Sequence, residues 1–321
     1  MVFAGAMALA LVAAGWMWWF WPTPVLPPPE TEAAAVVVAT AGAPALPAPR
    51  APPTLPTLPT QGGEQSLEQL LARPNDGNWH LTPLAGQAAV RVLEFPDLIT
   101  QGHALNRAAA LIEKGSASRE RVLDDAALAA LIAQGGDNTA TYFLGHDYPA
   151  AGLARFYNLA LAQQVALNTE EQRLRGLLVN AGLLIEGQGG LVSGAEPGAL
   201  VTFSALQRDD PATRPDESVD AARRASVLRH ELSHGRYFTD ARYRAHCAFF
   251  WRSLLTEAER QSWRRYLADQ GYDARNEDLM INETQAFLMH TPDERDFKAA
   301  DLHWKDADLA ALRERFQLGL K

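Results

Sequence analysis

The sequence has almost no cysteine and no cluster of basic residues. Its 321 residues include one cysteine, Cys247, which excludes an intramolecular disulfide and a cysteine-rich zinc site. The net charge is −9, and no run of Lys or Arg is available for a phosphate backbone, so nucleic acid is not an expected partner. Hydrophobic residues make up 47% of the chain, enough for a full-sized core. Any metal ion must therefore bind to His, Asp or Glu.

Charge is also missing from the start of the chain. The run VFAGAMALALVAAGWMWWFW, residues 2–21, has no charged side chain and is long enough as a helix to cross a hydrocarbon layer of about 30 Å. It predicts a membrane anchor at residues 1–21, with a cleaved signal peptide as the alternative. The first charges that follow are acidic, Glu30 and Glu32. We therefore expect the remaining chain to lie outside the cytoplasm, in a periplasmic or extracellular position.

A proline-rich segment follows the apolar run. Residues 22–59 hold 12 of the 20 prolines and few charges, a composition typical of extended tethers. We expect a linker over residues 22–63. The sequence Ser66-Leu67-Glu68-Gln69 has the pattern of a helix capping box, and it marks the start of a folded domain predicted to span residues 64–321.

The two halves of this domain have different patterns. The first half mixes strand-like alternation with helical spacing of apolar residues, whereas almost everything after Pro215 is predicted to be helical. We expect an α+β fold with a mixed N-terminal lobe, a small sheet and a mainly helical C-terminal lobe. The predicted elements of the first half are strands at 89–95, 182–186 and 200–204 and helices at 105–114, 124–134 and 150–167.

The stretch VLRHELSHG sets two histidines four residues apart, with a glutamate directly after the first. Asp216 and Ser218 are available N-caps for a helix that continues into His230. On that helix His230 and His234 share one face and can hold a single metal ion, while Glu231 projects toward a bound water. Neutral imidazoles suit zinc, and a carboxylate just outside the ligand set can take the proton of an attacking water.

This HExxH helix resembles the signature of the zincin superfamily of metallopeptidases, and the resemblance covers about the last third of the chain. It implies a zincin-like fold with the active site between two lobes, a bound Zn²⁺ and hydrolysis of peptide bonds in a peptide or protein substrate. Arg236 departs from the pattern, because zincins usually place an apolar residue there.

A third ligand separates the groups of zincins. Asn282-Glu283, followed by Ala286, resembles the second ligand helix of gluzincins, in which a glutamate binds the metal, so Glu283 is favoured. A carboxylate among apolar neighbours also needs a cation. Its separation of 49 residues from His234 is longer than in thermolysin-like enzymes. Phe287 stands where those enzymes carry an aspartate that orients a zinc-bound histidine, so the groups that orient the ligands must differ.

Asp240 is the rival third ligand. It lies six residues after His234, where metzincins place theirs, but Tyr237 occupies the position of the glycine that turns the metzincin chain. The favoured role for Asp240 is an N-cap of the next helix.

The sequence leaves the oxyanion donor and the exact function open. A non-catalytic zincin-fold binding or scaffold domain at the membrane, with a structural zinc, and a cell-wall peptide hydrolase are the alternatives to a peptidase. The retained Glu231 and the lack of an evident fourth ligand favour catalysis. The donor candidates are Tyr237, Tyr243, His246, Tyr272 and His290, while His80, His103, His146 and His303 have no metal-like spacing and are expected to be structural.

Overall fold

The first described helix begins at the capping box that the sequence predicts. In the computed structural model, which describes residues 63–320, Ser66 accepts from the backbone N–H of Gln69 and the Gln69 side chain accepts from that of Ser66. Helix α1 (Leu67–Ala72) follows. The predicted anchor, and all of the predicted linker except Gly63, lie outside the described residues. Within residues 63–320, no helix is both long and apolar enough to span a membrane.

A four-stranded mixed sheet in the order β1-β2-β6-β3 occupies the first half of the domain. Strands β1 (His80–Leu84) and β2 (Gln87–Phe95) are antiparallel, and β2 runs parallel to β6 (Ala199–Ser204). The edge strand β3 (His146–Pro149) pairs antiparallel with β6. The predicted strands at 89–95 and 200–204 are confirmed as β2 and β6, but β3 was missed because four residues are too few for a period of two to stand out.

Helices α2 (Leu98–Ile112) and α4 (Ala150–Ala162) contact this sheet. Helices α3 (Asp125–Gln134) and α5 (Thr169–Asn180) pack against α2. Helix α2 begins earlier than predicted because Asp97 caps it, accepting from the Thr100 N–H at 2.7 Å. Helix α4 ends five residues earlier than predicted, just before Gln164, whose φ is 56°. A separate hairpin of β4 (Leu184–Glu186) and β5 (Val192–Gly194) lies outside the main sheet.

After residue 215 the described chain is almost wholly helical, as predicted. The elements are α6 (Ala221–Thr239), α7 (Ala241–Phe249), a π-helical turn at Phe250–Leu254, α8 (Glu257–Asp269), α9 (Glu277–His290) and α10 (Asp306–Leu318). The predicted caps of α6 were wrong. Asp220 is the N-cap and accepts from the Arg223 N–H at 2.8 Å, whereas Asp216 accepts from the Ser218 N–H in a turn upstream.

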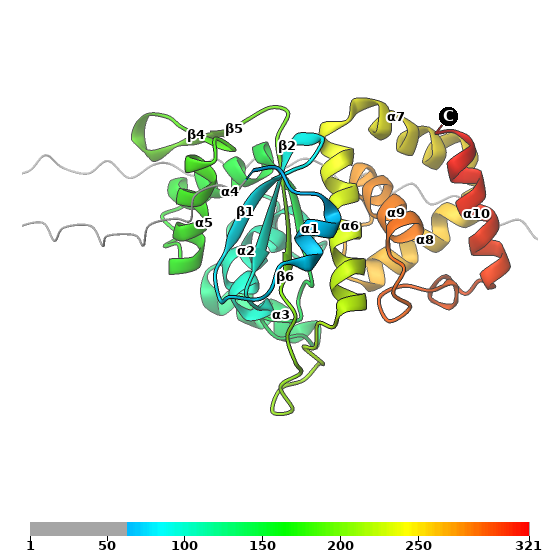
Figure 1. Cartoon of the computed structure of the whole chain (residues 1–321), viewed down its shortest axis with the longest axis horizontal. Coiled ribbons are helices and arrows are strands. Elements are labelled where there is room, and N and C mark those ends of the chain that lie inside the picture. Colours follow the sequence, from blue (N-terminus) through cyan, green and yellow to red (C-terminus); the bar gives the residue numbers. More distant parts are fainter. Residues whose placement is uncertain (1–62, 321) are drawn as a thin grey trace, which may run out of the picture. The chain divides into compact units, whose positions relative to one another are not determined.

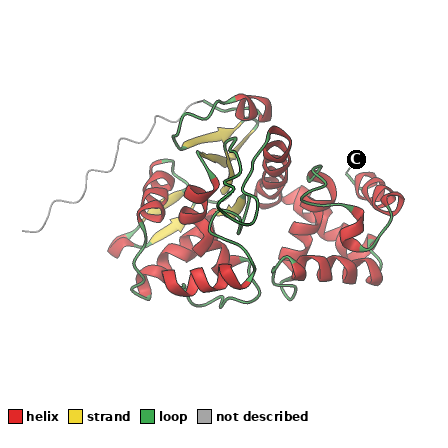
Figure 2. Cartoon of the chain, turned by 90° about the horizontal axis from the view of Figure 1, so that it is seen from below, coloured by secondary structure: helices red, strands yellow, loops and turns green. Residues whose placement is uncertain are grey.

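Helix α6, which carries the HExxH motif, lies between the sheet and the C-terminal helices (Figure 1). It packs against β6 and β3 on one side and α9 on the other, and Figure 2 shows the C-terminal helices grouped on the side away from the strands. Gly235 allows this approach, because a Cβ atom there would lie 2.9 Å from Val90 Cγ1 and 3.1 Å from Val201 Cγ1. The predicted α+β class is confirmed, with a small mixed sheet and 53% helix among the described residues.

Candidate metal centre

Three side chains from α6 and α9 meet in the interior of the domain. Glu283 Oε2 lies 3.7 Å from His230 Nε2 and 3.8 Å from His234 Nε2, and all three side chains are buried. Tetrahedral zinc with bonds of about 2.0–2.2 Å sets neighbouring ligand atoms about 3.4 Å apart. The three predicted ligand residues are therefore together at a spacing close to that of a zinc site, although their role as ligands stays a prediction.

The hydrogen-bonding state of these atoms also fits a cation. Both ring nitrogens of His234 and Oε2 of Glu283 are buried and have no hydrogen-bond partner within the described part of the chain. Buried polar atoms are otherwise paired in folded proteins, and an ion bound between His234 Nε2 and Glu283 Oε2 would supply a partner for both of these atoms. Burial lowers the pKa of His230 to about 3 and that of His234 to about 4. Both imidazoles are therefore neutral near pH 7, the form in which histidine binds metals.

Thr291 orients the first histidine. Its hydroxyl oxygen lies 2.7 Å from His230 Nδ1 and donates to the Ala286 carbonyl at 3.1 Å. The hydroxyl therefore accepts from the Nδ1–H of His230, which leaves the Nε2 lone pair facing Glu283. Phe287 packs edge-on against the His230 ring at a centroid distance of 4.7 Å. Thr291, four residues after Phe287, thus holds the His230 ring in one orientation.

Glu231 and Asp147 form a second acidic group beside the trio. Asp147 Oδ2, on β3, lies 3.6 Å from His234 Nε2, and Asp147, Glu231 and His234 are a second set whose ligand atoms lie within 4.8 Å of one another. Burial raises the pKa of Glu231 and of Asp147 well above the usual range, and the negative charges of Glu283 and Glu113 raise both further. Asp147 was not predicted as a site residue, because it lies 84 residues before Glu231 in the chain and no local pattern links the two.

A pocket of about 280 Å³ opens onto His230 and Glu231. Of the five candidate oxyanion donors, only Tyr272 lines this pocket. The hydroxyl of Tyr237 donates to Asp278 Oδ1 and that of Tyr243 to Gln285 Oε1, each at 2.7 Å. The remaining two are also engaged elsewhere, His246 against the ring of Phe316 at 4.7 Å and His290 beside the Tyr243 hydroxyl at 3.2 Å.

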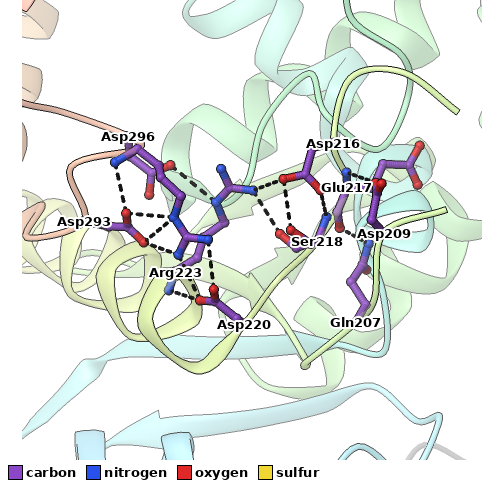
Figure 3. Close-up of polar contacts among 10 residues, drawn as sticks. Gln207, Asp209, Asp216, Glu217, Ser218, Asp220, Arg223, Asp293 and Asp296 are labelled. Atoms are coloured by element: carbon purple, nitrogen blue, oxygen red, sulfur yellow. Dashed lines mark hydrogen bonds and ion pairs between the residues drawn. The ribbon is translucent and has the colours of Figure 1, made fainter. Parts of the chain in front are cut away.

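The rim of the pocket is held by ion pairs between the start of α6 and the segment after α9. Arg295 contacts both carboxylate oxygens of Asp220, at 2.8 and 2.9 Å. Arg223 lies 3.5 Å from Asp296 Oδ1 and 3.6 Å from Asp216 Oδ2. Figure 3 shows Asp220, Asp293 and Asp296 gathered at this end of α6. Arg295 and Asp296 both line the pocket, so this network fixes one side of its opening.

Asp240 does not lie with His230, His234 and Glu283. Its carboxylate accepts from the Arg242 and Tyr243 N–H groups at 3.0 and 3.1 Å and caps α7, as the sequence favours. It also pairs with Arg236 at 3.4 Å, which accounts for a charged residue at that position of the motif. The other six histidines, which include His80, His103, His146 and His303, are absent from both clusters of candidate ligands among the described residues.

In comparisons with protein-family models, curated proteins and solved structures, nothing matches this chain. A functional proposal for this chain therefore rests on the geometry of the site and on the HExxH motif.

Proposed function

We propose that this chain is a zinc-dependent peptidase of the zincin type, with the gluzincin ligand set of His230, His234 and Glu283 and with Glu231 as general base. The observation that carries the proposal is the buried trio, in which His234 and Glu283 have unpaired ligand atoms, with Glu231 next to His230 at the pocket wall. A trio without an adjacent acid would suit a structural ion equally well. A buried carboxylate that has one unpaired oxygen and faces a pocket suits proton transfer.

The residues divide the chemistry of peptide hydrolysis between them. A bound zinc ion would polarise the substrate carbonyl and lower the pKa of a coordinated water. Glu231 would accept a proton from the water that attacks the carbonyl carbon and return a proton to the leaving nitrogen. The Tyr272 hydroxyl, at the wall of the same pocket, is the proposed donor to the carbonyl oxygen.

One observation favours a second candidate, a zincin-fold scaffold domain that binds zinc without hydrolysis. Asp147 is close enough to His234 Nε2 to become a fourth protein ligand, and a closed set of four is typical of structural zinc. Against this, Asp147 groups with Glu231 and His234, whereas His230 and Glu283 belong to the other set. Binding of one ion by all four residues would therefore require a rearrangement.

The experiment compares the full-length chain with Glu231→Gln and Asp147→Asn. Zinc is measured by elemental analysis and cleavage by mass spectrometry of peptide mixtures that include cell-wall peptides, because hydrolysis of wall peptide is the third possibility. We expect all three proteins to hold one zinc, and Glu231→Gln to cleave at least ~100-fold more slowly. Loss of zinc in Asp147→Asn, together with no cleavage by the wild type, would establish the scaffold instead.

The proposal places the domain outside the cytoplasm, held to a membrane by residues 2–21. The support is the uncharged length of that segment, which lies outside the described residues. A reporter that is active only outside the cytoplasm, fused after Lys321, tests it: a silent fusion in the membrane fraction would reverse the orientation.

A further inference from the structure

Lys114, just after α2, is a buried cation without an ion-pair partner. It is 9% exposed, and its ammonium donates to the Gln270 carbonyl oxygen at 3.0 Å. No ion pair within residues 63–320 includes it. Buried charges in proteins are ordinarily paired, and an ammonium has three N–H donors. At least one donor of Lys114 is therefore unused.

Aromatic rings surround the ammonium. The ring centroids of Phe143, Tyr142 and Tyr272 lie 4.3, 4.8 and 5.4 Å from Nζ. Such faces stabilise a cation electrostatically without supplying a hydrogen-bond acceptor. Burial lowers the pKa of the Lys114 ammonium, and the rings act in the opposite direction by favouring its charged form. They leave its remaining donors free.

The ammonium lies at the wall of the pocket that also holds His230 and Glu231. Lys114 lines this pocket, and so do Gln270 and all three aromatic residues that surround Nζ. The other basic side chain of the pocket wall, Arg295, is already paired with Asp220 and Asp293. Lys114 is thus the cation at this wall that has no carboxylate in contact.

The nearest carboxylates do not form an ion pair with Lys114. Glu113, Asp137 and Glu283 influence Lys114 only from beyond ion-pair distance. Glu283 is assigned to the metal, and Asp137 accepts from the Thr141 hydroxyl at 3.1 Å. Burial, followed by the charge of Glu283, raises the pKa of Glu113 to about 8. A carboxylate that enters the pocket would therefore meet an available cation.

We propose that Lys114 binds a carboxylate of the substrate, so that the enzyme selects peptides that carry a carboxylate close to the cleaved bond. This inference rests on the proposed peptidase function. The carboxylate is either the C-terminal group of the peptide or the side chain of Asp or Glu, which share the same chemistry. The pocket, at about 280 Å³, lies just below the usual range of about 300–1,000 Å³, and so it suits a short portion of a peptide chain.

The test uses the full-length zinc protein and four synthetic peptide libraries. The libraries carry either a free-acid or an amidated C-terminus, each with or without Asp and Glu, and cleavage rates are read by mass spectrometry. Lys114→Met removes the charge, whereas Lys114→Gln removes the charge but keeps a donor for the Gln270 carbonyl. Lys298→Met is the matched control, because Lys298 is exposed and does not line this pocket.

We expect wild type and Lys298→Met to cleave carboxylate-bearing peptides roughly 10-fold or more faster than their neutral counterparts. Both Lys114 variants should bring this ratio toward one. Dependence on the free-acid terminus identifies the C-terminal carboxylate, whereas dependence on Asp or Glu identifies the side chain. A merely structural role of Lys114 would slow cleavage of all four libraries without changing the ratio, and that result overturns the inference.

The ratio of cleavage rates for carboxylate-bearing and neutral peptides, measured on the wild type alone, provides a second test that does not require the variants to fold. If the wild type cleaves all four libraries equally, the inference is wrong while the peptidase assignment stands. If the wild type cleaves none of them, the proposed function fails and the inference fails with it.

Discussion

The backbone of Gly145 lies directly against the carboxylate of Glu231. A Cβ atom on residue 145 would come within 2.7 Å of Glu231 Cγ and Cδ, a separation that would force one of the two residues to move. Helix α6, which carries Glu231, is packed against the sheet on one side and against α9 on the other. The Glu231 side chain is therefore the part that would move. The position of the proposed general base thus depends on a glycine at the start of the edge strand.

Gly145→Ala should displace the Glu231 carboxylate and slow peptide cleavage by roughly 10–100-fold, since misplacement of a reacting group by about 1 Å has an effect of this size. The zinc content should not change, because the ligands lie on α6 and α9. Gly152→Ala is the control, as its Cβ atom would meet neighbours only at 3.5 Å and beyond. Equal cleavage rates for the two variants would show that Glu231 has room to adjust.

Thr291→Val should weaken zinc binding while nearly conserving side-chain shape. The valine cannot accept from His230 Nδ1, and loss of such an orienting contact typically lowers metal affinity by about 10–100-fold. Competition with a chromophoric chelator measures the affinity. Thr291→Ser keeps the hydroxyl and should bind zinc nearly as well as the wild type. A valine variant with wild-type affinity would mean that packing alone holds the His230 ring.

The two candidate third ligands should behave differently on truncation. Glu283→Ala is expected to lose bound zinc, because it leaves two histidines from a single helix as the remaining ligands of the trio. Asp240→Ala should keep zinc and instead lose about 1 kcal/mol of unfolding free energy through the missing cap of α7. Elemental analysis and denaturant unfolding measure the two effects. The opposite pattern of zinc loss would assign Asp240 as the ligand.

His146 should make the fold sensitive to acid. Burial lowers its pKa to about 3, well below the value of about 6.5 expected when the chain is unfolded. The unfolded state therefore binds more protons below pH 6.5, and the free energy of unfolding falls as the pH drops from 6.5 toward 3.

His146→Phe removes this titration and keeps an aromatic ring beside Phe143, whose centroid lies 5.1 Å from that of His146. Between pH 7 and pH 5 the wild type should lose about 2 kcal/mol more than the variant. Urea unfolding at both pH values checks this. Parallel losses would show that the histidine is protonated equally in both states.

The parts of the site that were predictable from the sequence lie on single helices. His230, Glu231 and His234 share α6, and their common face follows from the helical period alone. Glu283 was predicted from the resemblance of Asn282-Glu283 to the second ligand helix of gluzincins, with support from its place among apolar residues on one helix face. In each case the information lies within a few turns of one helix.

The parts that were missed depend on tertiary pairing. Asp147 reaches His234 only because β3 joins the sheet beside β6, and a strand of four residues has no clear periodic signal. Thr291 becomes an acceptor for His230 only after the chain leaves α9 and returns to α6. Of the oxyanion candidates, Tyr272 is distinguished by lining the pocket, a property that no local pattern encodes.

The pocket wall also has a consequence for the order of folding. The segment after α2 pairs with the segment after α8: Gly115 donates to Gly271, Asp273 donates to Glu113, and Lys114 reaches Gln270 across 156 positions of the chain. Contacts between such distant positions carry the full entropy of loop closure and tend to slow folding. We therefore expect the pocket to be completed after α6 and the sheet have formed. A newly made chain would then pass through a state in which the HExxH helix is folded but the segments after α2 and α8 are not yet paired.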